Sequence, residues 1–208
     1  AGPTREHLDP VRFLSNPSTG RMGYAIAAVA AERGADVRLV SGPVEIPPPP
    51  GVRVVRVISA EEMFAATLEA MEGADAVVAA AAVADQRPAV RAPQKVKKQP
   101  GTETLLLERT PDVLLTVSER FVGAGRPVLV GFAAETESVE ANAREKLERK
   151  RLDFVVANDV SAEGSGFGTE TNEVLLVDGA GTERLPLQSK RAVAGAILDR
   201  IARLLAAR

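Results

Sequence analysis

Short apolar runs alternate with longer amphipathic stretches along most of the chain, a pattern that indicates alternating strands and helices. The apolar runs predict strands at residues 37–40, 52–57, 76–82, 104–107, 128–132, 154–157 and 174–177. Apolar positions that recur every three or four residues predict helices at about 21–33, 60–72, 111–121, 138–151 and 189–206. Several strands are almost wholly apolar, as is typical of parallel strands that are covered on both faces. We therefore expect an α/β fold with a Rossmann-like, doubly wound, mainly parallel sheet, helices on both faces, and a C-terminal β-hairpin extension closed by residues 178–181.

One domain accounts for this order of elements, because 208 residues is an ordinary length for a single α/β domain. The proline run at residues 46–51 is followed at once by a strand pattern, so we interpret it as a stiff connector within the domain. Ala1-Gly2-Pro3-Thr4 already has the pattern of a turn that follows a first strand. We therefore expect the sequence to be one piece of a longer polypeptide.

Composition narrows the possible functions. The formal net charge of −2 and the 3% aromatic content argue against nucleic-acid binding through a basic field or stacking platforms. The lack of cysteine excludes disulfides and a thiolate nucleophile, and a single histidine, His7, excludes a histidine metal cage. The longest apolar run, residues 76–84, is far shorter than a membrane span. We expect a cytoplasmic protein with neither a nucleic-acid nor a membrane partner.

The stretch SNPSTGRMG, residues 15–23, leads directly into an apolar helix pattern. Small polar residues at a helix start form either a simple cap with packing glycines or a cradle of backbone N–H groups for a phosphate or carboxylate. The spacing of Gly20 and Gly23 is not that of a dinucleotide fingerprint, and Ser41 stands where such a fold usually has an acid. The local pattern leaves the cap and the anion cradle open.

Small and polar residues follow the predicted strands at their carboxyl ends, where doubly wound sheets bind ligands. Ala79, Ala80 and Ala81 leave room for a flat ligand against the backbone. Asp85 follows them and is placed to accept hydrogen bonds from a ligand or to hold a divalent cation, with a helix or turn cap as its alternative role. Phe132 ends another apolar strand at the same expected edge.

Lysines near this edge suit a polyphosphate, because each is a compact point charge. Lys95 and Lys97 alternate about Val96 as they would on a strand, so both are expected to point one way while Val96 anchors the other side. Lys146 and Lys150 lie four residues apart on a predicted helix and share a face. A solvated surface is the alternative for both pairs.

Taken in order, these segments resemble one family, phosphopantothenate-cysteine ligase, also called phosphopantothenoylcysteine synthetase, of coenzyme A biosynthesis. The resemblance is carried by motifs over nearly the whole chain: Ala1-Gly2-Pro3-Thr4-Arg5-Glu6, Asp9-Pro10-Val11-Arg12, residues 15–23, Ala81-Ala82-Val83-Ala84-Asp85, Lys95-Val96-Lys97-Lys98, Gly131-Phe132-Ala133-Ala134-Glu135-Thr136 and Ala157-Asn158-Asp159-Val160. Such a set is far more specific than a lone glycine-rich loop.

The resemblance implies an acid–amino-acid ligase that forms a C–N bond in two steps. The carboxylate of 4'-phosphopantothenate attacks the α-phosphate of CTP to give an acyl-cytidylate and pyrophosphate, and the amine of L-cysteine then displaces CMP. It also implies a divalent cation, commonly Mg²⁺, and a homodimer. Such ligases are often fused behind a flavin-dependent decarboxylase, so residues 1–208 are expected to be one ligase domain, with FMN only on a decarboxylase domain outside this sequence.

Site residues carry over from the matching motifs. Lys95 is expected to stabilise charge on the nucleotide phosphates in the first half-reaction, and Asn16 to act on the acyl-cytidylate in the amide-forming half. Arg12 is expected to help hold phosphopantothenate, and Asp85 is the residue placed to hold the metal ion. The positions that match CTP-binding ones are Ala79, Ala80, Ala81, Asp85, Lys95, Pro111, Asp112, Val113, Leu114, Phe132, Lys146 and Lys150.

Two other functions have a similar order of elements. A short-chain NAD(P)-dependent oxidoreductase needs Tyr-x-x-x-Lys, but the single tyrosine, Tyr24, is followed four residues later by Ala28. A non-catalytic nucleotide-binding module accounts for Asp85 and the lysines, but not for the stretch around Asn16.

Overall fold

A five-stranded sheet forms the centre of the molecule, in the order β11-β10-β9-β8-β5. Its strands are β5 (Ala76–Ala79), β8 (Val128–Glu135), β9 (Phe154–Asp159), β10 (Thr171–Asp178) and β11 (Gly181–Ser189). In this computed structural model, which describes residues 1–98, 100–121 and 125–208, β5, β8 and β9 run parallel and β9, β10 and β11 run antiparallel. The predicted C-terminal hairpin is confirmed as the antiparallel edge of a mixed sheet.

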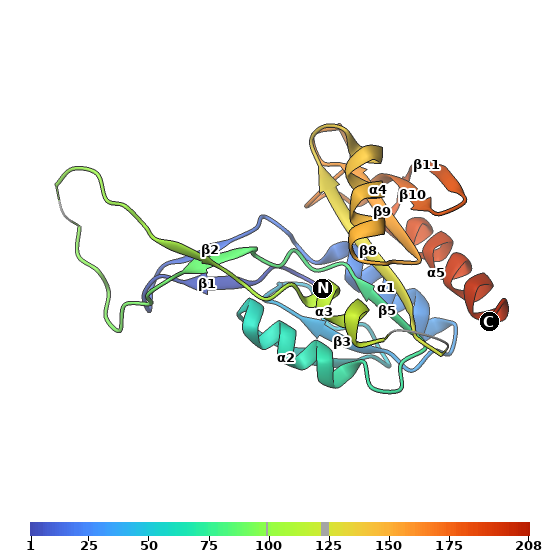
Figure 1. Cartoon of the computed structure of the whole chain (residues 1–208), viewed down its shortest axis with the longest axis horizontal. Helices are drawn as coiled ribbons and strands as arrows, with labels where there is room; N and C mark the ends of the chain where they lie inside the picture. Colours follow the sequence, from blue (N-terminus) through green and yellow to red (C-terminus); the bar gives the residue numbers. More distant parts are fainter. Residues whose placement is uncertain (99, 122–124) are drawn as a thin grey trace.

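Helices cover both faces of this sheet, as predicted (Figure 1). On one face α1 (Arg21–Glu32) and α5 (Lys190–Ala206) pack over the strands, and on the other α3 (Val113–Arg120) and α4 (Val139–Arg149) do so. The alternation along β8 explains the two layers, because Val128 and Val130 belong to the first core and Leu129 to the second. The Rossmann-like α/β class is therefore confirmed.

A smaller parallel pair, β3 (Arg38–Ser41) and β4 (Arg53–Arg56), is connected to the main sheet by the first residues of the chain. The backbone N–H of Gly42 donates to the carbonyl of Ala1, and Pro3 forms a parallel bridge with Ala82. Residues 1–4 thus pass between the two sheets with Gly2 at φ 72°, and they form no turn, so their interpretation as a turn was wrong. Helix α2 (Ala60–Ala70), with a complete Ser59–Glu62 capping box, contacts β3 and α3.

Four very short strands form an arm that extends from the body (Figure 1). They pair antiparallel as β1 (Arg5–His7) with β2 (Phe13–Ser15), and β6 (Gln86–Pro88) with β7 (Leu107–Arg109). Sequence patterns missed β1, β2 and β6. The strand predicted at 104–107 was wrong, because β7 begins at Leu107. Each has only three residues and little burial, so no apolar period marks it.

The predicted strand-like alternation of Lys95 and Lys97 about Val96 was also wrong. These residues belong to no strand, and Val96 is exposed instead of anchoring a second side. The strand predicted at 76–82 ends at Ala79, and the helix predicted at 111–121 begins at Val113. Within the residues that the structure describes, no helix is long and apolar enough to cross a membrane.

Candidate active site

A cavity of about 380 Å³ opens at the carboxyl ends of the parallel strands, beside the first turn of α1. This volume is in the range of small-molecule sites. Its walls come from most elements of the body. The residues that line it include Ser18, Thr19, Gly20, Arg21, Gly23, Ala79, Ala80, Ala81, Asp85, Arg109, Pro111, Asp112, Val113, Leu114, Phe132, Lys146, Lys150, Asn158, Phe167, Asn172 and Lys190.

The first turn of α1 presents backbone donors to this cavity. Gly20 is the N-cap in a left-handed conformation with φ 77°, and within the described part of the chain no side chain caps the helix and no acid lies in its first turn. Gly23 also serves packing, because a Cβ there would lie 2.6 Å from the Cβ of Ala1. Of the two alternatives, the side-chain cap is therefore not formed within the described residues, although the glycines do pack closely, and the anion cradle stays a prediction.

Lysines of α4 form a cationic side of the cavity. The Lys146 ammonium donates to the carbonyl oxygen of Phe132 at 2.5 Å, and Lys150 forms an ion pair of 2.8 Å with Asp112, the N-cap of α3. Burial, and next the charge of Lys150, lower the pKa of Lys146. Burial raises the pKa of Asp112, but the hydrogen bond from Lys150 and that from the N–H of Leu115 outweigh it, so the net shift is downward.

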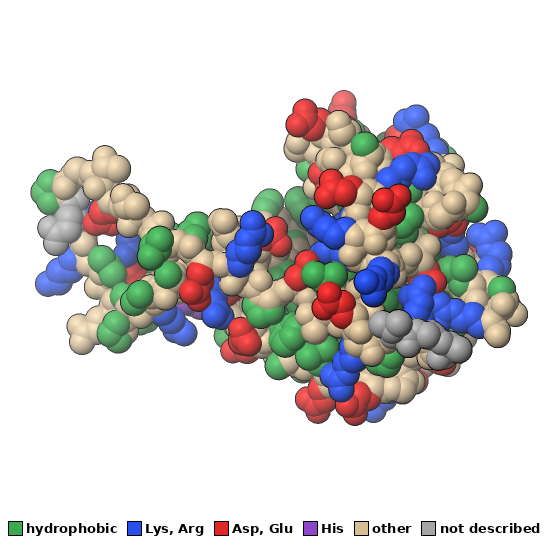
Figure 2. Space-filling view, viewed as in Figure 1, with side chains coloured by type: hydrophobic (Ala, Val, Ile, Leu, Met, Phe, Trp, Pro, Cys, Tyr) green, Lys and Arg blue, Asp and Glu red, His purple; other side chains and the backbone are tan. Residues whose placement is uncertain are grey.

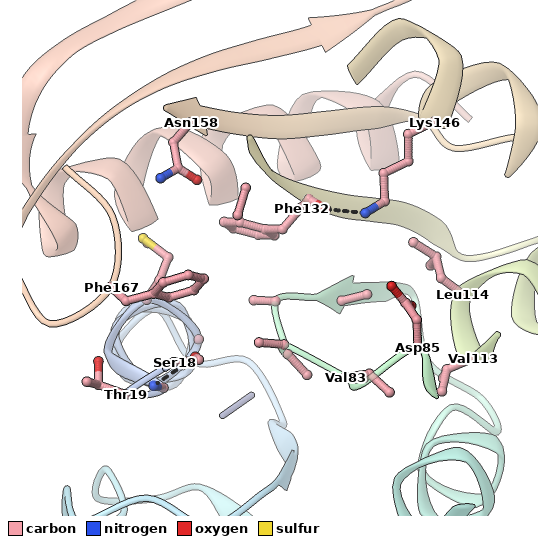
Figure 3. A pocket seen from close by; sticks show the side chains of 18 of the residues that line it. Ser18, Thr19, Val83, Asp85, Val113, Leu114, Phe132, Lys146, Asn158 and Phe167 are labelled. Carbon is pink, nitrogen blue, oxygen red and sulfur yellow. Dashed lines mark hydrogen bonds between the residues drawn. The ribbon is translucent and has the colours of Figure 1, made fainter. Parts of the chain in front are cut away.

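A glycine-rich loop, residues 164–169, closes the other side of the cavity. Figure 3 shows Phe167 and Asn158 on this side, opposite Asp85, Val113 and Leu114. Lys190, at the first turn of α5, is 5% exposed and donates from its ammonium into this loop. Burial, followed by the charge of Arg21, lowers the pKa of Lys190 to about 8.

A second cavity, of about 430 Å³, adjoins the first. It is lined by Leu14, Ser15, Asn16, Ala84, Asp85, Gln86, Leu107 and Arg109. Asp85 and Arg109 line both cavities, so the two cavities meet at these residues. The side chain of Asn16 is held there by a 3.0 Å hydrogen bond to the carbonyl of Ala82.

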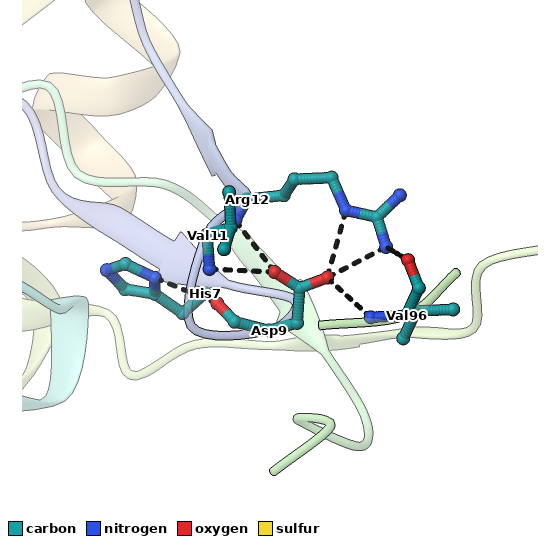
Figure 4. A network of polar contacts seen from close by, with 5 residues as sticks. All are labelled: His7, Asp9, Val11, Arg12 and Val96. Atoms are coloured by element: carbon teal, nitrogen blue, oxygen red, sulfur yellow. Dashed lines mark hydrogen bonds and ion pairs between the residues drawn. The ribbon is translucent and has the colours of Figure 1, made fainter. Parts of the chain in front are cut away.

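The structure brings most of the predicted nucleotide residues together in the first cavity, namely Ala79, Ala80, Ala81, Asp85, Pro111, Asp112, Val113, Leu114, Phe132, Lys146 and Lys150. Asn16 lies in the second cavity instead. Lys95 and Arg12 line neither cavity of their own chain, because both are on the arm. Arg12 is bound to Asp9 and to the carbonyl of Val96 (Figure 4).

Sequence patterns missed three residues of the cavity walls. Lys190 follows a serine at an ordinary helix start, Arg109 is in a strand too short to have a period, and Phe167 lies in a loop. Nothing in their immediate sequence distinguishes them from surface residues, so they become visible only once the chain is folded.

No cluster of three or more His, Asp or Glu side chains suited to hold a metal ion occurs among the residues that the structure describes. Asp85 is an exposed carboxylate in the wall of the first cavity, and the other carboxylate in this wall, Asp112, is paired with Lys150. That arrangement fits Mg²⁺, which is commonly held by one or two carboxylates together with the phosphates of a nucleotide.

Residues 1–205 match the family described as DNA/pantothenate metabolism flavoprotein C-terminal domain. The chain belongs to this family. The chain is 47% identical over 207 residues to the coenzyme A biosynthesis bifunctional protein CoaBC of Vibrio vulnificus and 48% identical over 206 residues to CoaBC of Bacillus subtilis. These matches cover 99% and 98% of the chain but 51% and 50% of the relatives, so the chain spans about half the length of the curated relatives it matches.

Solved structures agree with the fold of this chain. A crystal structure of the C-terminal domain of CoaBC has a TM-score of 0.82 and 41% identity, and the match covers 100% of this chain and 94% of that one. A Cab2 mutant in complex with phosphopantothenate-cysteine has a TM-score of 0.78 at 16% identity, covering 99% and 86%, and shows likeness of fold alone. The family resemblance expected from the sequence motifs is confirmed.

Proposed function

We propose that this domain is a phosphopantothenate-cysteine ligase of coenzyme A biosynthesis, using CTP to join 4'-phosphopantothenate to L-cysteine. The observation that carries the proposal is the pair of adjoining cavities, which share Asp85 and Arg109. A reaction between a nucleotide and an acid needs two ligands that meet at one point. The names of the CoaBC relatives, and the ligand of the Cab2 complex, support this substrate class.

The first cavity is the proposed CTP site. Lys146 and Lys150 supply positive charge from α4, and the uncapped first turn of α1 supplies backbone N–H groups. Phe132 and the alanines at 79–81 offer a flat ligand a surface made of apolar side chains and backbone.

The second cavity is the proposed site for the reacting end of phosphopantothenate. A carboxylate oxygen of that substrate attacks the α-phosphorus of CTP, and the bond to the β-phosphate breaks so that pyrophosphate leaves. The amine of cysteine then attacks the acyl carbon, CMP leaves with the electrons of the C–O bond, and the amine loses a proton. We assign the second step to Asn16, which lies in this cavity with its amide already oriented by Ala82.

Asp85 is the residue of the shared wall that would hold Mg²⁺, which when bound supplies charge neutralisation to the triphosphate. This domain contributes no nucleophile of its own in the proposed reaction. Its side chains bind the two substrates, orient them and stabilise charge as it develops.

We infer that the working unit is a homodimer. The arm exposes a row of apolar side chains (Figure 2), made up of Val11, Phe13, Val90, Val96, Leu105, Leu106 and Leu107. Val90 and Leu106 are 80% and 73% exposed, which favours cover by another protein surface. Since Lys95 lies on the same arm, a second copy that covers this row would receive Lys95 at its own CTP site.

The proposal extends to the whole protein. Because the relatives are about twice as long and are named bifunctional, we propose that a further domain carries an FMN-dependent decarboxylase activity. The substrates are metabolites of the cell interior, and this part of the chain has no cysteine to oxidise, so we propose a cytoplasmic location.

The function is tested by incubating the protein with CTP, Mg²⁺, phosphopantothenate and cysteine. We expect release of pyrophosphate and CMP with formation of the amide. Lys95→Gln should abolish pyrophosphate release, whereas Asn16→Asp should let the acyl-cytidylate accumulate. CTP binding without pyrophosphate release would instead indicate a nucleotide-binding module, and NADH consumption would indicate an oxidoreductase.

A further inference from the structure

Asp9 is a fully buried carboxylate in the thin arm, apart from the hydrophobic cores of the body. Oδ1 accepts hydrogen bonds of 2.8 Å from the backbone N–H groups of Val11 and Arg12. Oδ2 accepts from Nε and Nη2 of Arg12, at 2.9 and 2.8 Å, and from the backbone N–H of Val96 at 3.2 Å (Figure 4). Among the residues that the structure describes, every hydrogen bond to Oδ2 therefore comes from Arg12 or Val96.

These bonds join two segments that are far apart in the sequence. The turn at residues 8–12 follows β1, whereas Val96 lies in the long connection between β6 and β7. The guanidinium of Arg12 also donates to the carbonyl of Val96 at 3.3 Å, and the N–H of Ala92 donates to the carbonyl of Leu8 at 2.8 Å. We call the Asp9–Arg12–Val96 contacts the arm clamp.

The arm clamp needs the charged form of Asp9. Of the five donors to the Asp9 carboxylate, four lie within 2.9 Å of an oxygen, and two of these four belong to the guanidinium of Arg12. Burial raises the pKa of Asp9, but the hydrogen bonds from the Val11 N–H, the Arg12 side chain and the Val96 N–H outweigh it and hold this pKa below its usual range. The carboxylate therefore stays ionised at neutral pH.

Lys95 is the immediate neighbour of Val96, and its side chain is exposed. Within the described residues between 92 and 98, the backbone is tied to the rest of the arm through Ala92 and through both backbone groups of Val96. Within its own chain, the position of Lys95 thus depends on the arm clamp, because its bonded neighbour Val96 is held by both backbone groups while the Val96 side chain is 41% exposed.

We propose that Asp9 is a positioning residue for the ligase reaction: its carboxylate, through Arg12 and the Val96 N–H, fixes the segment that presents Lys95. The inference rests on the proposed function, in which Lys95 acts on the nucleotide phosphates. The Arg12 side chain is 45% exposed although its Nε and Nη2 are bound within the arm, so this bracing role is compatible with the role expected for Arg12 toward phosphopantothenate.

Asp9→Asn tests the clamp with little change of shape. Oδ1 can still accept from Val11 and Arg12, but the new amide nitrogen faces the guanidinium and the Val96 N–H, all of which are donors. Misplacement of a catalytic group by about 1 Å can cost about a hundredfold in rate, so we expect kcat for pyrophosphate release to fall by about that factor. Asp36→Asn, which breaks an exposed ion pair with Arg53 on the body, is the matched control.

A spin label gives a readout that does not depend on activity. Because the protein has no cysteine, Gln94→Cys creates a unique labelling site beside Lys95. Asp9→Asn should make this label markedly more mobile, with no change in circular dichroism or in the dimer peak on gel filtration, and Asp36→Asn should leave it unchanged. If Asp9→Asn does not fold, Arg12→Gln is used, because it removes the guanidinium while leaving the turn bonds of Asp9.

The outcomes separate the inference from the proposed function. Wild-type protein that releases no pyrophosphate overturns the ligase. An active wild type, an inactive Lys95→Gln and an Asp9→Asn variant with unchanged kcat and label mobility overturn the positioning role. If Arg12→Gln leaves the label as immobile as in the wild type, Arg12 does not brace the segment and the inference fails. Lower kcat together with a mobile label supports it.

Discussion

The ammonium group of Lys190 donates a 2.9 Å hydrogen bond to the carbonyl oxygen of Gly166. It also donates to the carbonyl and hydroxyl oxygens of Thr169, at 2.5 and 3.2 Å, so its three donors all go to one loop. That loop carries Phe167 into the wall of the first cavity. A buried lysine thus holds a glycine-rich loop in the one conformation that shapes the pocket.

Lys190→Met should loosen this loop while filling the same space. Hydrogen bonds to charged groups typically contribute about 2 kcal/mol, so we expect the free energy of unfolding to fall by about that amount. KM for CTP should rise more than kcat falls, because the proposed role of Phe167 is to bound the nucleotide site. Denaturant unfolding and steady-state kinetics check the two effects.

A fluorescent reporter within the loop tests directly whether Lys190 holds the loop in place. The protein has no tryptophan, so Phe167→Trp introduces a single one. In the Lys190→Met background this tryptophan should be quenched more readily by acrylamide than in the Lys190 background. Equal quenching in both would show that the loop keeps its place without the lysine.

Asp112 combines two roles that different substitutions can separate. Its side chain caps α3 by accepting from the N–H of Leu115 at 3.1 Å, and it pairs with Lys150. Asp112→Ala removes both and should cost about 1 kcal/mol of folding free energy for the cap. Asp112→Asn should keep the cap, because asparagine is an equally good N-cap, but replace the ion pair with Lys150 by at most a neutral hydrogen bond.

Both Asp112 variants should weaken CTP binding to a similar degree if Lys150 needs its partner for its position. Calorimetric titration with CTP measures this. Weaker binding by Asp112→Ala alone would contradict that expectation, and would assign the effect to the start of α3.

The pKa of Asp9 predicts how the stability of the protein changes in acid. Because its pKa in the folded state lies below that of the unfolded chain, the carboxylate stabilises the folded state fully above about pH 4. This contribution is lost as the pH falls through the folded-state pKa. The difference in unfolding free energy between wild type and Asp9→Asn should therefore be constant from pH 7 to about 5 and shrink below about pH 4.

Chemical unfolding at matched ionic strength across this range provides the measurement. Asp36→Asn serves as the control, because it removes an exposed carboxylate for which no comparable clamp exists in its surroundings. A difference that grows toward low pH would mean that Asp9 is protonated in the folded arm.

The body of the molecule was predictable because buried strands have an unmistakable pattern. Val128, Leu129 and Val130 are all fully buried, so apolar residues are needed at each position and the run stands out in the sequence. Amphipathic helices such as α5 were predicted for the same reason, since one face packs on the sheet and the other meets water.

The arm was not predictable from such patterns, because its order comes from single polar contacts. Asp9 accepts a hydrogen bond from a residue 87 positions away, and no local rule links those two positions. The motifs around Arg12 and Lys95 did carry the family resemblance, but their distance from the first cavity appears only in the folded chain. Arg109 and Lys190 were missed in the same way, since each becomes part of a site through tertiary contacts.

The two ends of α1 offer the sharpest test of the role of its first turn. Gly20 precedes the helix with φ 77° and Gly34 follows it with φ 85°, so alanine is strained at both positions. A Cβ at Gly20 would also lie 2.6 Å from Cγ1 of Val44, whereas a Cβ at Gly34 would meet nothing within 4 Å. Gly34→Ala is therefore a matched control that reproduces the backbone strain without the crowding.

Gly34→Ala should cost about 1–2 kcal/mol of unfolding free energy, the usual penalty for a left-handed alanine, and leave CTP affinity unchanged. Gly20→Ala should cost more, because Val44 must move, and it should also weaken CTP binding since the N–H groups of the first turn are displaced. Denaturant unfolding measures the stability of the two variants, and CTP titration measures their affinity for the nucleotide. If Gly20→Ala loses stability but binds CTP as the wild type does, the first turn of α1 plays no part in holding the nucleotide.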